Sequence, residues 1–143
     1  MKISDVMTPE VQLCTPDDTL RDVADAMGTL GVGILPVTDN ERLVGMITDR
    51  DIAVRGIGMG RGPESRVGDI MTAEVKYCFE DQEIEDIAQN MGAIQVRRLP
   101  VLNRDKRLVG IIALGDIAQI RPNDGTGAAL SQISRPTTQH AQI

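Results

Sequence analysis

Aromatic side chains and positive charge are both scarce in this chain. Its 143 residues include one Tyr, one Phe and no Trp, so any hydrophobic core must be built from aliphatic side chains. Lys and Arg number 15 against 21 Asp and Glu, which gives a net charge of −6. Because phosphate backbones attract basic proteins and repel acidic ones, nucleic acid is excluded as the main partner.

Long apolar runs and catalytic constellations are also missing. No run approaches the roughly 18 residues of a membrane span, and the first four residues begin no signal peptide. His140 is the only histidine, so there is no Cys/His cluster at metal spacing. We find no nucleophile with a neighbouring base and no catalytic carboxylate pair. We therefore expect a cytoplasmic protein that is not an enzyme, with no membrane partner, no metal and no required cofactor.

An internal repeat dominates what is present. The word Asp-Val-Met-Thr at residues 5–8 returns as Asp-Ile-Met-Thr at residues 69–72, an offset of 64. Between positions 5 and 37, 15 of 33 residues are identical at this offset, and after one inserted residue the match continues at an offset of 65. Such self-similarity marks a duplicated structural unit. Each copy is small for an independent domain, so we expect the two copies to share one core.

The two cysteines occupy matching positions of the repeat. Cys14 falls on Cys78 at the offset of 64. We interpret both as small core residues in a reducing cytoplasm. A disulfide or a metal site, for example one that uses Cys78, stays open as an alternative.

Periodicity predicts strand, helix, strand, strand, helix in each copy, after a short helical arm at residues 2–8. In copy one we expect a strand at 11–14, an amphipathic helix from Leu20 that Gly28 and Gly31 end, a hairpin of strands 34–38 and 43–48 with a turn at 39–41, and a helix at 49–54. In copy two we expect strands at 75–79, 96–102 and 108–113, a helix at 84–91 and a helix from Asp116.

Glycine and proline mark the boundaries. We predict repeat one at 3–55, a Gly-rich joint at 56–68, which could instead be a lid, repeat two at 69–120 and a flexible tail at 121–143. The tail contains a possible docking segment with Ala128, Leu130 and Ile133, together with His140.

The junction from Gly45 to Ile52 is the strongest candidate site. A strand ends at Thr48 and a helix follows, so the Thr48 hydroxyl and the Asp51 carboxylate share one small volume with free helix N–H groups. A carboxylate at such a junction can accept hydrogen bonds from two sugar hydroxyls. The alternative is that Thr48 or Asp49 caps the helix and Asp51 offsets its dipole.

The repeat carries three motifs in register: Asp-h-Met-Thr, Leu-Pro-Val and Gly-h-h-Thr-x-x-Asp, where h is apolar. Over about residues 3–120 the chain resembles the CBS domain pair, or Bateman module, and is most similar to stand-alone bacterial pairs of the hypoxic response type. The resemblance implies an α/β (α+β) fold of tandem repeats, with two small sheets flanked by helices and related by a pseudo-two-fold axis. It also implies a regulatory role, adenosine nucleotides or S-adenosylmethionine as ligands, and a homodimer.

The resemblance also implies a composite cleft, in which ribose-binding groups of one copy face basic residues of the other. The residues expected to line it are Met46, Ile47, Thr48, Arg50, Asp51, Lys76, Tyr77, Arg97 and Arg98. Arg97 and Arg98 are consecutive in a strand and would point to opposite faces. Tyr77 can stack on adenine or simply pack in the core, as its counterpart Leu13 suggests.

The reciprocal cleft would combine Ala113, Gly115 and Asp116 with Gly33 and Ile34, and it has lost the threonine and both arginines. We therefore expect one functional nucleotide site (AMP, ADP, ATP or S-adenosylmethionine) per chain and an unidentified downstream protein. The alternative is an interaction or structural module with empty, degenerate clefts.

Overall fold

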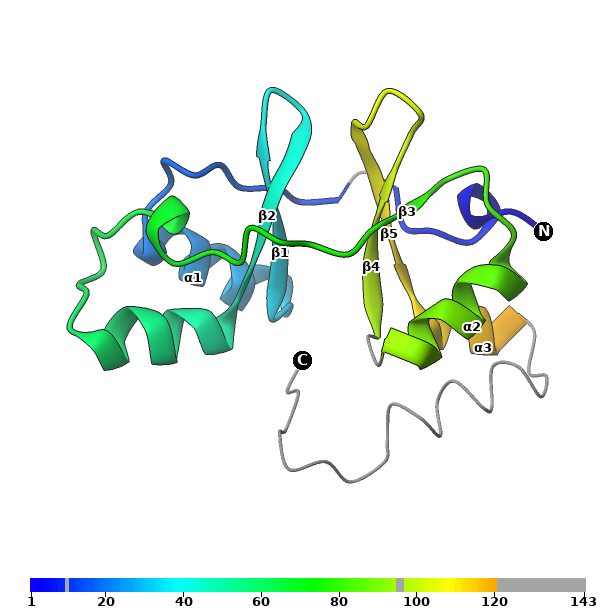
Figure 1. Cartoon of the computed structure of the whole chain (residues 1–143). Coiled ribbons are helices and arrows are strands. Elements are labelled where there is room, and N and C mark those ends of the chain that lie inside the picture. The colour runs from blue at the N-terminus through cyan, green and yellow to red at the C-terminus, as the bar shows by residue number, and fades with distance from the viewer. Residues whose placement is uncertain (10, 95–96, 121–143) are drawn as a thin grey trace. The chain divides into compact units, whose positions relative to one another are not determined.

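The computed structural model describes residues 1–9, 11–94 and 97–120 (Figure 1). By internal contacts the chain divides into two compact units. Of the described residues, one unit joins Met1–Val11 to Lys76–Ile120, and the other contains Gln12–Val75. Each unit combines a small sheet with helices, as the repeat predicts.

The Gln12–Val75 unit begins with helix α1 (Leu20–Leu30). Thr19 caps it, since its side chain accepts a hydrogen bond from the Asp22 N–H. Leu20, Val23 and Met27 form its buried stripe. The prediction that Gly28 ends this helix is wrong: the helix continues to Leu30, and only Gly31 adopts the left-handed conformation that terminates it.

Strands β1 (Ile34–Asp39) and β2 (Arg42–Thr48) form the predicted antiparallel hairpin. Asn40 and Glu41 at its tip have φ angles of 51° and 68°. Positive φ at both central residues is typical of the tight turn whose twist matches that of the strands. The predicted strand at 11–14 is wrong in extent, because among its described residues only Cys14 pairs, in parallel with Val37.

The helix after β2 is longer than predicted. Helical backbone starts at Asp49, passes through a π-helix at Asp51–Gly56 (η2) and ends as a 3-10 helix at Ile57–Met59 (η3). The expected end at Val54 is wrong because Gly56 is buried inside the helix, where a Cβ would lie 3.0 Å from Leu20 Cδ1. Gly56 therefore gives close packing between this helix and α1. A further 3-10 helix, Val67–Asp69 (η4), follows.

The other unit contains the 3-10 helix Ile3–Asp5 (η1), strand β3 (Cys78–Phe79), helix α2 (Ile84–Ile94), strands β4 (Arg98–Leu102) and β5 (Leu108–Ala113), and helix α3 (Leu114–Ile120). β3 pairs in parallel with β4, and β4 pairs antiparallel with β5. The predicted strand at 75–79 is shorter than expected, and Val96 lies outside the described residues. The tail predictions, including Ala128, Leu130, Ile133 and His140, also fall outside them.

Each unit has its own aliphatic core, so the expected single shared core is wrong. Val67 and Ile70, from the start of copy two, complete the core of the Gln12–Val75 unit, whereas Ile3, from the start of copy one, is buried in the other core. Each core is thus completed by the arm that begins the opposite copy. The boundaries 3–55 and 69–120 describe the sequence copies and stay a prediction.

The arms also cover one sheet strand in each unit. The Met46 N–H and carbonyl exchange hydrogen bonds of 2.9 Å with Thr72, and Thr8 exchanges bonds of 2.8 and 3.0 Å with Ile111.

Among the described residues no helix is long and apolar enough to cross a membrane.

Candidate functional site

Thr48 and Asp51 form a reciprocal pair at the point where β2 becomes a helix. The Thr48 backbone N–H donates to Asp51 Oδ2 at 3.0 Å, and the Asp51 backbone N–H donates to Thr48 Oγ1 at 3.0 Å. A residue spacing of three at a helix start favours this arrangement because it satisfies two backbone donors. The structure therefore shows a helix cap at Thr48, as the alternative interpretation predicts.

The Thr48 and Asp51 side chains also have hydrogen-bonding capacity that the cap does not use. Thr48 is buried, whereas the Asp51 side chain is 16% exposed. Asp51 Oδ2 accepts the capping hydrogen bond. Within the described part of the chain, the only partner of Oδ1 is the Arg55 guanidinium, whose Nη1 lies 3.8 Å away. The Thr48 hydroxyl accepts one bond and keeps its proton to donate. One carboxylate oxygen and one hydroxyl proton therefore stay available to a ligand.

The π-helix that starts at Asp51 is a second sign of a site. The Ile57 N–H donates to the carbonyl of Ile52, five residues earlier. Such wide turns are rare, and they are frequently found at functional sites. Sequence reasoning missed Arg55 because it placed the helix end at Val54. The i,i+4 spacing from Asp51 to Arg55 is the signal that would have found it.

The other expected residues of copy one differ in exposure. Ile47 is fully buried in the core, so only its backbone could reach a ligand. Met46 is 9% exposed and its backbone pairs with Thr72. Arg50 is exposed, and its backbone N–H donates to Asp49 Oδ1 at 2.8 Å.

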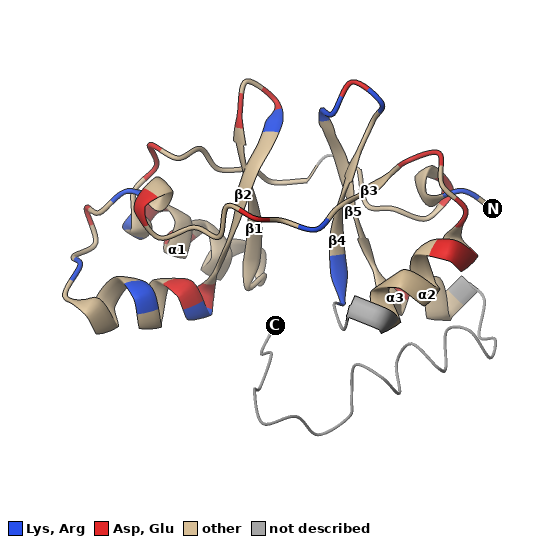
Figure 2. Cartoon of the chain, viewed as in Figure 1, with Lys and Arg blue, Asp and Glu red and all other residues tan. Residues whose placement is uncertain are grey.

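The expected residues of copy two belong to the other unit. Arg97 and Arg98 are both exposed at the start of β4, which is blue in Figure 2. Among the described residues neither guanidinium has a hydrogen-bond or ion-pair partner, so both charges are available to an anion. Lys76 is exposed, and the Tyr77 ring, 41% exposed, stands edge-on against Phe79 with a centroid distance of 5.6 Å.

The matching junction of copy two lacks the pair. Ala113 replaces Thr48 and has no hydroxyl, and within the described part of the chain no hydrogen bond joins it to Asp116. Gly33 and Arg97 also correspond: the Gly33 carbonyl accepts from the Asp49 N–H at 2.9 Å, and the Arg97 carbonyl accepts from the Leu114 N–H at 2.8 Å. The backbone hydrogen bond at this junction is therefore present in both copies, whereas the side-chain pair of Thr48 and Asp51 is present in copy one alone among the described residues.

The two cysteines are free thiols in the cores of their own units. Burial raises the pKa of the Cys14 thiol to about 12, with a further contribution from Asp18, and burial raises the pKa of the Cys78 thiol to about 12. Metals bind the thiolate, which such a pKa suppresses. Among the described residues no group of three or more His, Cys, Asp or Glu side chains could hold a metal ion.

Comparison with solved structures supports this fold. The crystal structure of Hypoxic Response Protein I with two coordinated zinc ions has a TM-score of 0.76 and 34% identity, over 85% of this chain and all of that chain. The crystal structure of CBSX2 in complex with AMP has a TM-score of 0.73 and 27% identity, over 83% of this chain and 94% of that chain.

Sequence relatives extend over nearly the whole length. CBS domain-containing protein YhcV of Bacillus subtilis is 38% identical over 133 residues, which is 92% of this chain and 94% of that protein. Hypoxic response protein 1 of Mycobacterium tuberculosis is 33% identical over 134 residues, 92% of this chain and 93% of that protein. The model of the CBS domain matches residues 3–56 and again residues 67–123. With two matches in tandem, the chain belongs to the CBS domain family, as a CBS domain pair.

Proposed function

We propose that this chain is a cytoplasmic, non-catalytic regulatory module that binds an adenosine nucleotide at Thr48 and Asp51. The observation that carries the proposal is the open Oδ1 of Asp51 beside a hydroxyl that still has a proton to donate. A sugar diol can donate to that oxygen and accept from that hydroxyl. The AMP bound to CBSX2 supports the same ligand class.

In this proposal the ligand's phosphate is bound by basic residues of copy two. Arg97 and Arg98 are exposed guanidinium groups without partners among the described residues, and Lys76 is also exposed. Guanidinium groups can bind phosphate oxygens in a bidentate way. The residues proposed to bind the ligand are Met46, Ile47, Thr48, Arg50, Asp51, Lys76, Tyr77, Arg97 and Arg98.

Because Ala113 offers no hydroxyl, we propose that the reciprocal set of residues, Ala113, Gly115 and Asp116 of copy two with Gly33 and Ile34 of copy one, binds a nucleotide weakly or not at all. Binding then changes the protein's state only if the ligand has a higher affinity for one conformation.

Titration calorimetry with AMP, ADP, ATP and S-adenosylmethionine tests the proposal. Saturable heat with at least one ligand supports it, and no heat with any of them at millimolar concentration rejects it.

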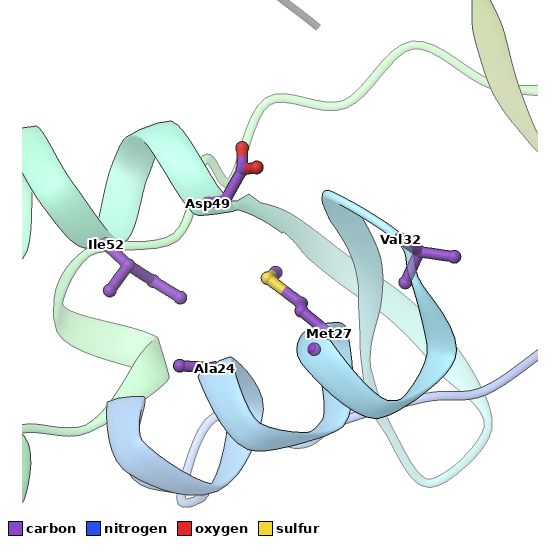
Figure 3. A pocket seen from close by; sticks show the side chains of 6 residues that line it. Ala24, Met27, Val32, Asp49 and Ile52 are labelled. Carbon is purple, nitrogen blue, oxygen red and sulfur yellow. The ribbon is translucent and has the colours of Figure 1, made fainter.

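A second candidate function, an interaction module that forms a homodimer, is favoured by a separate observation. Ala24 and Met27 of α1, with Gly28, Val32, Asp49 and Ile52, surround a hollow of about 290 Å³ (Figure 3). Near it in the sequence, Leu30, Val54, Ile57 and Met59 are between 47% and 72% exposed. Exposed apolar groups gathered on a surface typically mark a binding face.

Sedimentation velocity tests this second function. If two copies meet through this face, Ile57→Glu gives a monomer, while Val75→Glu, at a half-buried position outside the helices, serves as the matched control and stays dimeric. A dimer that survives Ile57→Glu, or a wild-type monomer at high concentration, contradicts the proposed homodimer.

A further inference from the structure

Arg55 occupies the position next to the open oxygen of Asp51. Its Nη1 lies 3.8 Å from Asp51 Oδ1 and 3.5 Å from Thr72 Oγ1. The first distance exceeds that of a hydrogen bond and the second is at its limit. The Arg55 side chain is 45% exposed. The guanidinium is therefore held by charge rather than by fixed geometry, and it can move without breaking a well-made bond.

The helical spacing brings the two side chains together. Positions four apart lie on the same face of a helix. Asp51 opens this helix and Arg55 lies within it.

Binding of a sugar at Asp51 has a consequence for Arg55. A hydroxyl that donates to Oδ1 takes the place of the guanidinium, which then loses its only carboxylate partner in the described residues. Loss of this ion pair costs a modest amount of binding free energy, since Arg55 is 45% exposed, unless another anion replaces the carboxylate. A phosphate on the same ligand supplies such an anion, whereas adenosine has none. The carboxylate of S-adenosylmethionine is outweighed by its sulfonium and ammonium charges.

Resting on the nucleotide site proposed above, we propose that Arg55 is a specificity-determining residue of that site. It pairs with Asp51 when the site is empty and transfers to the ligand's phosphate when a ribose takes Oδ1. The site therefore favours phosphorylated adenosine nucleotides over adenosine and S-adenosylmethionine. A purely structural Arg55, which only connects Asp51 to Thr72, would affect all these ligands equally.

The test measures the affinities of AMP and adenosine by calorimetry in the wild type and in Arg55→Gln, Arg55→Lys and Arg61→Gln. Arg61 is the matched control, because it is 44% exposed and its Nη1 lies 3.7 Å from Asp69. We expect Arg55→Gln to weaken AMP binding roughly five- to tenfold, as loss of one partly exposed charged contact does, with adenosine binding unchanged or tighter. Arg55→Lys retains part of the preference, and Arg61→Gln leaves both affinities unchanged.

An equal loss of both affinities in Arg55→Gln, or no change in either, overturns the role of Arg55. These results differ from failure of the proposed function itself, in which the folded wild type binds neither AMP nor adenosine. Asp51→Ala separates the two roles further, since it removes the ribose contact and lowers both affinities together.

Discussion

Gly45 lies so close to Thr72 that a Cβ at Gly45 would come within 2.8 Å of the Thr72 carbonyl oxygen. The same relationship recurs in the other unit, where a Cβ at Gly110 would come within 2.8 Å of the Thr8 carbonyl oxygen. Both glycines face the arm that pairs with their strand, and a Met thioether lies equally close in each case. The arm can pair with the strand only because these two positions have no side chain.

We predict that Gly45→Ala and Gly110→Ala each lower the free energy of unfolding by about 1–3 kcal/mol, the usual cost of overpacking. Urea unfolding followed by circular dichroism measures this. Gly28→Ala is the matched control, because a Cβ there meets nothing within 4 Å. It should raise stability by about 0.5–1 kcal/mol, since Gly28 lies inside α1. Equal stability of all three variants would refute the close approach of the arms.

Asp81 and Arg104 predict a pH dependence. Arg104 Nε and Nη2 donate to the two Asp81 carboxylate oxygens at 2.8 and 2.7 Å, and the guanidinium lies 4.2 Å from the centre of the Phe79 ring. The hydrogen bonds from Arg104 hold the pKa of Asp81 below its ordinary 3.8. Its stabilising contribution is therefore complete above pH 3.8 and is lost as the pH falls through the lowered pKa.

Thermal unfolding of the wild type and Asp81→Asn measures this contribution. We expect a small difference in Tm at neutral pH, because the pair is exposed. The difference should vanish at pH values well below 3.8 and shrink in high salt. A difference in Tm that stays constant down to acidic pH would show that the charge of Asp81 does not stabilise the unit.

The raised pKa values of the two thiols predict that the stability of the fold decreases at alkaline pH. Their folded-state pKa values of about 12 exceed the ordinary 9.0, so the neutral thiols favour the folded state fully below pH 9.0. That contribution is lost as the pH rises from 9.0 through about 12. Cys14→Ala and Cys78→Ala should each reduce the fall in stability over this range, relative to the wild type, in urea unfolding. A thiol reagent should react slowly with the native protein and rapidly in urea; rapid native reaction would contradict the burial.

Much of this fold could be predicted from the sequence, because the repeat fixes two equivalent units and each junction has local signals. The hairpin of β1 and β2 follows from alternating strands with turn residues, and α1 from its apolar stripe. Thr48 and Asp51 could be singled out because their contact spans only three residues. The proposed contribution of Arg97 and Arg98 rested on the family resemblance and stays a prediction.

Long-range packing explains what could not be predicted. The low helix propensity of glycine led to the prediction that the copy-one helix ends at Val54. In the structure, burial of Gly56 against Leu20 outweighs that low propensity. Consequently Arg55 was left out of the predicted site. The shared core was expected from size alone, whereas each arm completes the opposite copy's core, an exchange that no local pattern encodes.

The central claim, one adenosine nucleotide site per chain at Thr48 and Asp51, is tested most directly by AMP calorimetry on the wild type, Asp51→Ala and Asp116→Ala. Asp116 is the matched control, since it occupies the same position of copy two. We predict one AMP bound per chain, loss of binding in Asp51→Ala, and wild-type affinity and stoichiometry in Asp116→Ala. Undiminished AMP binding by a folded Asp51→Ala variant, or loss of binding in Asp116→Ala alone, would contradict the account.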